Sequence, residues 1–289
     1  MFRDGLTPSR IPLMAVTDLS SRLALDERGI WRVRETEEIS YPDTGNAACF
    51  QLEDNSFWFR HRNSCIVALV KRFRPEGAIV DVGGGNGFVA QALISAGFDC
   101  ILLEPGPTGA LNAKIHREIP DVICSTIQGA RFESSSVAAV GMFDVLEHLE
   151  DDHGMVADLA RVLKTKGLFF GTVPAYQWLW STADEFAKHH RRYARESLLS
   201  LLARDYDVLY STYIFRALTL PIYIVRALPF RLGLTKKAGL MTSETEHGTD
   251  RGWAARMVSR VLAGELERLE RGLSQNWGAS LLFVARKKL

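Results

Sequence analysis

The sequence has few cysteines and no excess of charge of either sign. The four cysteines are widely and unevenly spaced over 289 residues, and no two of them form a Cys-x-x-Cys pair. This pattern excludes a disulfide scaffold and argues against a cysteine zinc site. The 35 Lys and Arg residues are balanced by 34 Asp and Glu residues. The composition therefore gives no reason to expect nucleic acid as a partner.

Long apolar runs are also missing. The segment from Met1 to Val16 has an early Asp and two prolines, but no apolar core of signal-peptide length. The apolar run at 217–225 is far shorter than the roughly 18–20 residues that a membrane-spanning helix needs. We therefore expect a cytoplasmic protein. Since 47% of the residues are apolar and 24% charged, the chain can form a sizeable globular core.

Short β-rich runs alternate with helical patterns over residues 77–212. The sequence predicts strands at 78–82, 99–104, 122–124, 137–143, 168–173, 206–210 and 280–285. It predicts helices at 88–96, 108–118, 151–163 and 253–271. This alternation indicates a parallel sheet covered by helices on both faces, and the continuous apolar strands agree with it.

A glycine-rich loop, Asp81-Val82-Gly83-Gly84-Gly85-Asn86-Gly87, links the first of these strands to the first helix. Its glycines allow a tight turn and a close approach to a ligand at the helix N-terminus. A nicotinamide dinucleotide fingerprint needs a third glycine where this chain has Phe88. The acid shortly before the first glycine suits a ligand with an ammonium group rather than a pyrophosphate. Glu104, at the end of the second strand, can accept hydrogen bonds from two ribose hydroxyls.

Four ordered blocks of the sequence resemble the class I S-adenosylmethionine-dependent methyltransferase family, of the small-molecule type. These blocks are the glycine loop with Asp81, the run 102–105, the run 143–149 and the run 159–168. The resemblance implies a Rossmann-like αβα sandwich with a seven-stranded mixed sheet in the order 3-2-1-4-5-7-6. It also implies S-adenosylmethionine as the cofactor, with no metal or redox group required.

The resemblance further implies which residues contact the cofactor. Around its methionyl part we expect the loop residues Asp81, Gly83 and Gly85, and Phe143 and Asp144 after the fourth strand. Its ribose would be held by Glu104, and its adenine would lie at Gln128 and Gly129. Arg62, in the segment before the domain, is expected to meet the carboxylate.

Two histidines are candidates for the general base. His148 follows the fourth strand, at the carboxyl edge where open α/β sheets bind ligands, and its ordinary pKa near 6.5 suits proton transfer at neutral pH. His189 lies in a polar and aromatic segment that is similar to a pattern in one subgroup of the family. The rest of that segment is expected to bind substrate: Trp180, Asp184, Arg191, Arg192 and Tyr193. For His148 the alternative is a role in helix capping or packing. For the segment around His189 the alternative is an ion-pair cluster that only holds the segment in place.

We predict three regions: an N-terminal extension and lid (1–74), a methyltransferase domain (75–212 and 279–289) and an inserted cap (213–278). The apolar, arginine-bearing segment 214–234 has three interpretations. It can lie in a membrane interface as a peripheral contact with the inner face, cover an apolar substrate, or join two copies as a homodimer.

The sequence thus predicts a methyltransferase acting on a small-molecule, glycan or lipid-linked acceptor, with methylation expected at an oxygen. Two alternatives remain: a nicotinamide-dependent oxidoreductase, and a protein that binds S-adenosylmethionine without catalysis. Nucleic-acid methylation is disfavoured because the chain lacks an Asn/Asp-Pro-Pro-Tyr tetrad.

Overall fold

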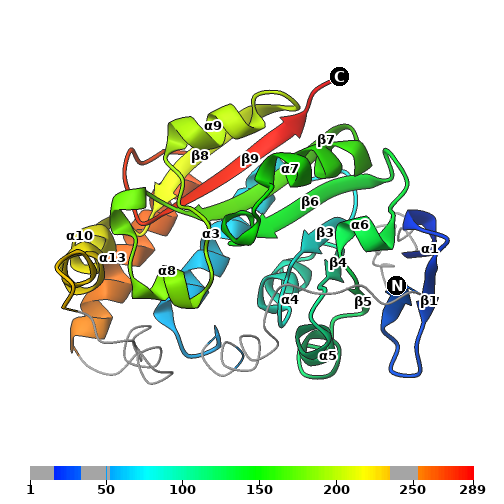
Figure 1. The fold of residues 1–289 in the computed structure, drawn as a ribbon, viewed down its shortest axis with the longest axis horizontal. Helices are drawn as coiled ribbons and strands as arrows, with labels where there is room; N and C mark the ends of the chain where they lie inside the picture. The colour runs from blue at the N-terminus through cyan, green and yellow to red at the C-terminus, as the bar shows by residue number, and fades with distance from the viewer. Residues whose placement is uncertain (1–15, 34–49, 51–52, 235–252) are drawn as a thin grey trace, which may run out of the picture.

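A mixed β-sheet forms the centre of the protein. The computed structural model describes residues 16–33, 50, 53–234 and 253–289, and its sheet has nine strands in the order β1-β2-β5-β4-β3-β6-β7-β9-β8 (Figure 1). The strands are β1 (Leu23–Leu25), β2 (Trp31–Val33), β3 (Ile79–Val82), β4 (Cys100–Leu103), β5 (Asp121–Cys124), β6 (Val137–Phe143), β7 (Leu163–Pro174), β8 (Tyr206–Ile214) and β9 (Ser280–Lys287).

The last seven strands confirm the predicted order, because β5-β4-β3-β6-β7-β9-β8 is 3-2-1-4-5-7-6 when those strands are numbered along the chain. Strand β9 is antiparallel to both of its neighbours, β7 and β8. The predicted number of strands was wrong, since β1 and β2 extend the sheet beyond β5 to nine strands. Strand β2 runs parallel to β5, with Trp31 aligned to Ile123.

The β1–β2 hairpin depends on one aspartate. Asp26 accepts hydrogen bonds from the backbone N–H groups of Arg28 and Ile30, both at 2.9 Å, and from Arg32 Nε at 2.7 Å. Such a side chain closes a turn that short strands cannot hold alone. With three residues in each strand, the alternation that reveals a strand in a sequence has no room to develop.

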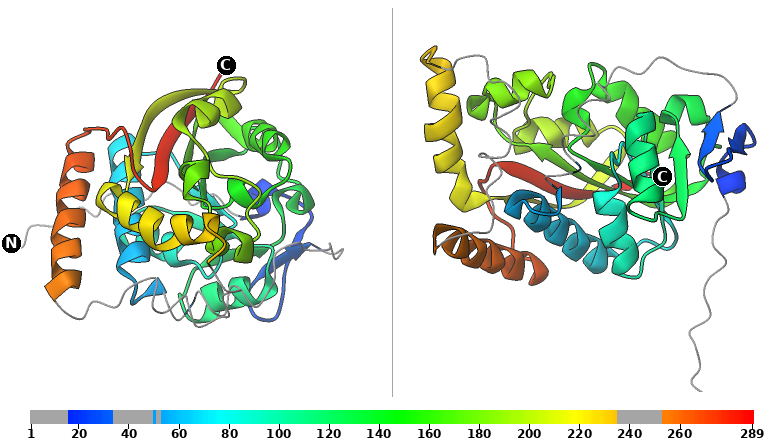
Figure 2. Two further views of the ribbon diagram at one scale, coloured as in Figure 1. Left: turned by 60° about the vertical axis from the view of Figure 1, so that its left-hand side comes forward. Right: turned by 90° about the horizontal axis from the view of Figure 1, so that it is seen from below.

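Helices cover the sheet on both faces. One face packs against α3 (Phe57–Phe73), α4 (Phe88–Ser95) and α5 (Pro107–Ile115). The other packs against α7 (Asp152–Val162) and α9 (Arg195–Leu202), with the short α1 (Val16–Leu19) and α6 (Ile127–Ala130) nearby. Helix α13 (Trp253–Glu270) lies alongside α3 (Figure 2). None of the helices in the described ranges has the length and apolar content of a membrane span.

The carboxyl ends of β6, β7 and β8 lie at one edge of the sheet, and a residue in the left-handed backbone region follows each of them. These residues are Asp144 (φ 56°), Tyr176 (φ 56°) and Phe215 (φ 61°). The conformation costs an L-residue about 1–2 kcal/mol. The chain turns sharply after each strand, and the residues that follow are kept at this edge.

The segment after β8 forms a helical arm at this edge (Figure 1), made of η3 (Arg216–Leu218), α10 (Thr219–Ile222), the π-helical turn η4 (Tyr223–Ala227) and α11 (Leu228–Arg231). The Tyr223 ring packs edge-on against Trp178, which follows β7, with 5.4 Å between the ring centroids. The predicted cap therefore reaches the carboxyl edge through its first half. Residues 235–252 of that cap, and residues 1–15, 34–49 and 51–52 of the predicted lid, lie outside the described residues.

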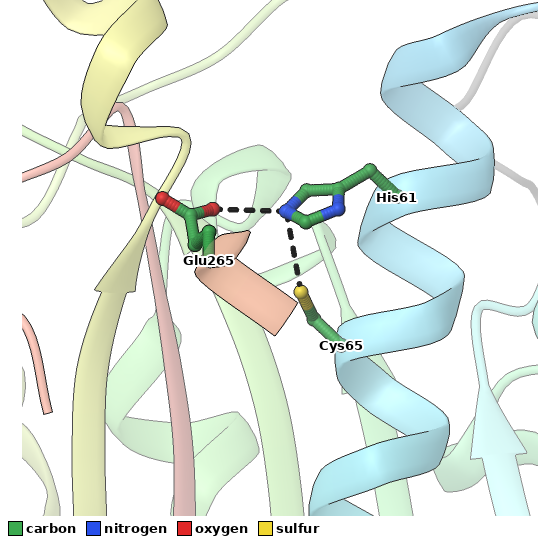
Figure 3. Close-up of side chains that lie close together, drawn as sticks. All are labelled: His61, Cys65 and Glu265. Atoms are coloured by element: carbon green, nitrogen blue, oxygen red, sulfur yellow. Dashed lines mark hydrogen bonds and ion pairs between the residues drawn. The ribbon is translucent and has the colours of Figure 1, made fainter. Parts of the chain in front are cut away.

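A buried polar cluster joins α3, α13 and the end of β8 (Figure 3). His61 Nε2 lies 2.9 Å from Glu265 Oε1 and 3.4 Å from Cys65 Sγ. Glu265 also accepts hydrogen bonds from the backbone N–H groups of Phe215 at 2.6 Å and Arg216 at 2.9 Å. The cluster thus holds α13 against α3 and fixes the start of the helical arm.

Candidate functional site

The glycine loop joins β3 to α4 at the carboxyl edge and needs glycine for steric reasons. A Cβ atom on Gly84 would lie 2.2 Å from Leu102 Cδ1 and 2.7 Å from the Asp81 carboxylate. Gly85 has a φ of 56°, and its N–H donates to Glu104 Oε2 at 2.8 Å. The loop is therefore folded closely over two carboxylates, Asp81 from β3 and Glu104 from the end of β4.

These two acids differ in the hydrogen bonds that their carboxylate oxygens accept. Glu104 accepts from the Gly85 N–H with one oxygen and from the Gly106 N–H, at 2.7 Å, with the other. Asp81 is only 1% exposed, and its Oδ2 has no hydrogen-bond partner among the described residues. Burial raises the pKa of Asp81 to about 7; the Arg62 charge opposes this rise and the Glu104 charge adds to it. A buried carboxylate oxygen without a donor is costly, and a cationic group on a ligand would satisfy it.

Arg62 comes from α3 and crosses to the end of β6. Its NH1 donates to Asp144 Oδ2, while Thr172 Oγ1 donates to the other oxygen of Asp144 at 2.8 Å. The Arg62 Nε is buried and has no hydrogen-bond partner within the described ranges. An arginine with an unused donor can bind a carboxylate. Arg62 and Asp81 thus suit the two charged ends of an amino acid, as the methionyl part of S-adenosylmethionine requires.

The other predicted cofactor residues lie at or near the same edge. Phe143 is buried at the end of β6. The Gly129 N–H donates to Thr126 Oγ1 at 2.9 Å, and this hydrogen bond lies at the start of α6. The Gln128 side chain donates to Asp158 on α7 at 2.8 Å. A contact between Gln128 and adenine stays a prediction, as does the role of Gly129, and in this structure the Gln128 amide is engaged elsewhere.

Asp184, in α8 (Thr182–Phe186), is the centre of the segment after β7. Its carboxylate accepts from the Ser181 N–H at 2.9 Å and from Arg192 Nε at 2.7 Å, and it lies 2.9 Å from His189 Nδ1. Burial opposes ionisation, but the hydrogen bond from His189 and the charge of Arg192 outweigh it and hold the pKa of Asp184 at about 2. Asp184 is therefore an ionised, enclosed group that orients His189 and Arg192.

The neighbouring residues tie the segment to α7. Tyr193 Oη donates to Asp152 at 2.8 Å, and Arg191 forms an ion pair with the same carboxylate at 2.8 Å. Arg191 and Arg192 also line a hollow of about 310 Å³. Trp180 is half-buried at the end of the 3-10 turn η2 (Gln177–Leu179). These contacts fit the alternative of an ion-pair cluster that pins the segment, and substrate binding by these five residues stays a prediction.

Replacement of Arg192 by Lys is expected to lower the free energy of unfolding by about 1–2 kcal/mol. A lysine cannot reproduce the two hydrogen bonds that the Arg192 guanidinium gives to the Asp184 carboxylate. Urea denaturation would measure the loss. Arg204→Lys is the matched control, because the Arg204 side chain is 83% exposed and its ion pair with Asp205 spans 3.5 Å. Equal losses for both variants would contradict the assigned role of Arg192.

The two predicted base candidates lie together. His148 ends the 3-10 turn η1 (Leu146–His148) after β6, and its ring centroid is 4.6 Å from that of His189. Burial and the nearby His189 lower the pKa of His148 to about 4. Beside them is Glu147, which the sequence analysis missed; it is 1% exposed, and burial raises its pKa well above the ordinary value. Its position directly before His148 in the run 143–149 was the available signal.

Comparisons with known proteins agree with this geometry. Residues 80–171 match the methyltransferase domain family. The chain is 24% identical over 131 residues to a Mycobacterium tuberculosis protein named as a probable S-adenosylmethionine-dependent methyltransferase, covering 45% of this chain and 47% of that one. It is 29% identical over 112 residues to the ubiquinone biosynthesis O-methyltransferase of Pectobacterium carotovorum, covering 36% of this chain and 46% of that enzyme. The chain therefore spans about half the length of the curated relatives it matches.

Solved structures are similar over a longer stretch. One is a methyltransferase in complex with the Haloferax volcanii Trm112 methyltransferase activator, with a TM-score of 0.54 and 18% identity over 86% of this chain and 96% of that one. Another is the Haemonchus contortus phosphoethanolamine N-methyltransferase 2 with bound S-adenosylhomocysteine, with a TM-score of 0.52 and 18% identity over 85% of this chain and 57% of that one. At this identity the structures show a shared fold. The family match over residues 80–171 and the named relatives support a class I S-adenosylmethionine-dependent methyltransferase domain in this chain.

Proposed function

We propose that this protein transfers the methyl group of S-adenosylmethionine to an oxygen atom of a small-molecule or lipid-linked acceptor. The observation that carries the proposal is the pair of buried, unsatisfied groups beside the glycine loop, Asp81 Oδ2 and Arg62 Nε. A zwitterionic amino acid group satisfies both of them. A nicotinamide dinucleotide offers no ammonium group to Asp81.

When bound, the cofactor supplies a methyl group on a positively charged sulfur, which is reactive without further activation. The protein then has to hold the cofactor and align the acceptor with the methyl group. Asp81, Glu104 and Arg62 bind the cofactor, and Asp144 orients Arg62. The acceptor enters on the side of His148 and His189. Its hydroxyl loses a proton as the new carbon–oxygen bond forms and the methyl–sulfur bond breaks, which leaves S-adenosylhomocysteine.

The helical arm supports an acceptor with an apolar part. Its residues Leu220, Ile224 and Val225 are 57%, 52% and 71% exposed, although they belong to an element at the carboxyl edge. Such a surface can cover an apolar acceptor or rest on a membrane interface. The predicted N-terminal extension belongs to the same proposal as a lid over the cofactor, and the inserted cap belongs to it as a cover over the acceptor.

Thermal unfolding with S-adenosylhomocysteine tests the cofactor half of the proposal. At about 100 times its dissociation constant the ligand should add about 2.7 kcal/mol of stability. We expect this gain to be lost in Asp81→Ala and Glu104→Ala and kept in Glu133→Gln, a change of an exposed acid. Stabilisation by NAD in place of S-adenosylhomocysteine would overturn the proposal in favour of an oxidoreductase.

A further inference from the structure

Three side chains that can bind metal meet beside the proposed acceptor position. One ligand atom each from Glu147, His148 and His189 lies within 4.8 Å of the others. Glu147 and His148 follow β6, and His189 comes from the segment after β7, so both strand ends contribute to the cluster. None of the three belongs to the cofactor contacts described above.

Both imidazole rings are held in the manner of metal-binding histidines. His189 Nδ1 lies 2.9 Å from the Asp184 carboxylate, which directs its Nε2 away from that acid. The His148 ring forms a hydrogen bond with the backbone of Ala187. Histidine ligands of metals commonly give their second ring nitrogen to a carboxylate or a backbone carbonyl, which fixes the tautomer and the ring orientation.

Glu147 supplies an independent observation that points to a ligand. Its side chain is buried, and Oε2 has no hydrogen-bond partner among the residues that the structure describes. Burying such an oxygen without a donor costs free energy that a coordinated cation would recover. We propose that Glu147, His148 and His189 bind one divalent transition-metal ion through two imidazole nitrogens and one carboxylate oxygen.

The chemistry of this donor set favours zinc, manganese or ferrous iron over magnesium or calcium, which prefer oxygen ligands alone. Three protein ligands leave coordination positions open for water or for the acceptor. If the proposed function holds, an acceptor hydroxyl bound there would have a lowered pKa. The hydroxyl would release its proton to solvent, and its oxygen would attack the methyl group as the methyl–sulfur bond breaks and S-adenosylhomocysteine leaves.

The cluster of His61, Cys65 and Glu265 shows why proximity alone is insufficient. There both oxygens of Glu265 already accept backbone hydrogen bonds, from Phe215 and Arg216. The same nitrogen of His61 faces the carboxylate and the thiol, and burial raises the pKa of Cys65 well above its ordinary value. This cluster is satisfied without an ion, whereas the Glu147 cluster is not.

Calorimetric titration of chelator-treated full-length protein with Zn²⁺, and with Co²⁺ as a spectroscopic probe, tests the proposal. We expect one ion per chain and visible Co²⁺ absorption bands. Glu147→Gln, His148→Gln and His189→Gln should each weaken Zn²⁺ binding about 100-fold or more. His153→Gln, a change of an exposed histidine, should leave it unaltered.

Stabilisation by S-adenosylhomocysteine is measured on the same variants and separates the two proposals. Its retention in His189→Gln shows that the variant folds and keeps the cofactor site, so a loss of Zn²⁺ binding then belongs to the metal site. Absence of binding at 100 µM Zn²⁺, or unchanged affinity in all three ligand variants, would overturn the metal site without touching the proposed cofactor.

Discussion

Replacement of Asp81 by Asn should stabilise the ligand-free protein at pH 8 and weaken its binding of S-adenosylhomocysteine about 100-fold. The pKa of Asp81 is about 7 in the folded protein against an ordinary 3.8, because the carboxyl is buried. The folded state therefore binds more protons than the unfolded chain between these values, and stability falls as the pH rises from about 4 to about 7. An asparagine at this position removes the pH-dependent loss of stability, so the variant should gain about 1–3 kcal/mol in free energy of unfolding at pH 8. The full pKa shift sets an upper limit of about 4 kcal/mol for this gain.

Urea denaturation at several pH values measures the stability effect. The variant and the parent should differ little near pH 4 and most at pH 8. The exposed-acid variant Glu133→Gln is the control and should follow the parent throughout. A constant difference between parent and Asp81→Asn across this range would show that the buried charge is not the cause.

A second ligand separates the binding effect from a general disturbance of the site. Because 5′-methylthioadenosine carries the adenosine and sulfur but no amino acid group, its affinity should be nearly equal for the parent and Asp81→Asn. Only ligands with the ammonium group should lose affinity. Equal loss for both ligands would mean that the substitution deforms the glycine loop.

Replacement of Glu265 by Ala should lower the free energy of unfolding by about 3–5 kcal/mol. The change removes the acceptor of two backbone N–H groups, those of Phe215 and Arg216, and the partner of His61. Each buried donor left without a partner costs about 1–3 kcal/mol. Urea denaturation provides the measurement. Glu267→Ala in the same helix is the matched control, because the Glu267 side chain is 62% exposed and should contribute less than about 1 kcal/mol.

The effect of Glu265 should also depend on pH. Burial opposes its ionisation, but hydrogen bonds from His61 and from the backbone of Arg216 and Phe215 prevail and lower its pKa below the ordinary 4.5. Its contribution is therefore complete above about pH 4.5 and is lost as the pH falls through the lowered pKa. The difference in free energy of unfolding between the parent and Glu265→Ala should become smaller in that acidic range. A gap that stays constant down to pH 3, or a Glu267→Ala loss of equal size, would refute the role of the cluster.

The sequence predicted the elements whose signal is local. Strand β6 is a continuous apolar run, and the loop that begins at Gly83 is dense in glycine, so the strand order and the place of the glycine loop followed from the pattern and the family resemblance. The β1–β2 hairpin was missed because its strands are too short for any periodicity to show.

Pairing between distant side chains is what the sequence could not provide. His148 and His189 were singled out separately, and only the meeting of the β6 and β7 ends places their rings together. The charges around Asp184 suggested substrate binding, but a sequence does not say which charges satisfy one another. Glu147 differs from an ordinary surface acid by its burial alone, which depends on the folded structure.

Among the residues with a left-handed backbone at the carboxyl edge, Asp144 lowers the stability of the fold while its side chain serves the proposed function. Glycine at position 144 would adopt the same backbone without the steric cost that Asp144 bears, about 1 kcal/mol. It would also remove the carboxylate that orients Arg62. Laboratory evolution for heat resistance alone would therefore tend to enrich glycine directly after β6, and such variants would emerge with an impairment of the proposed cofactor site.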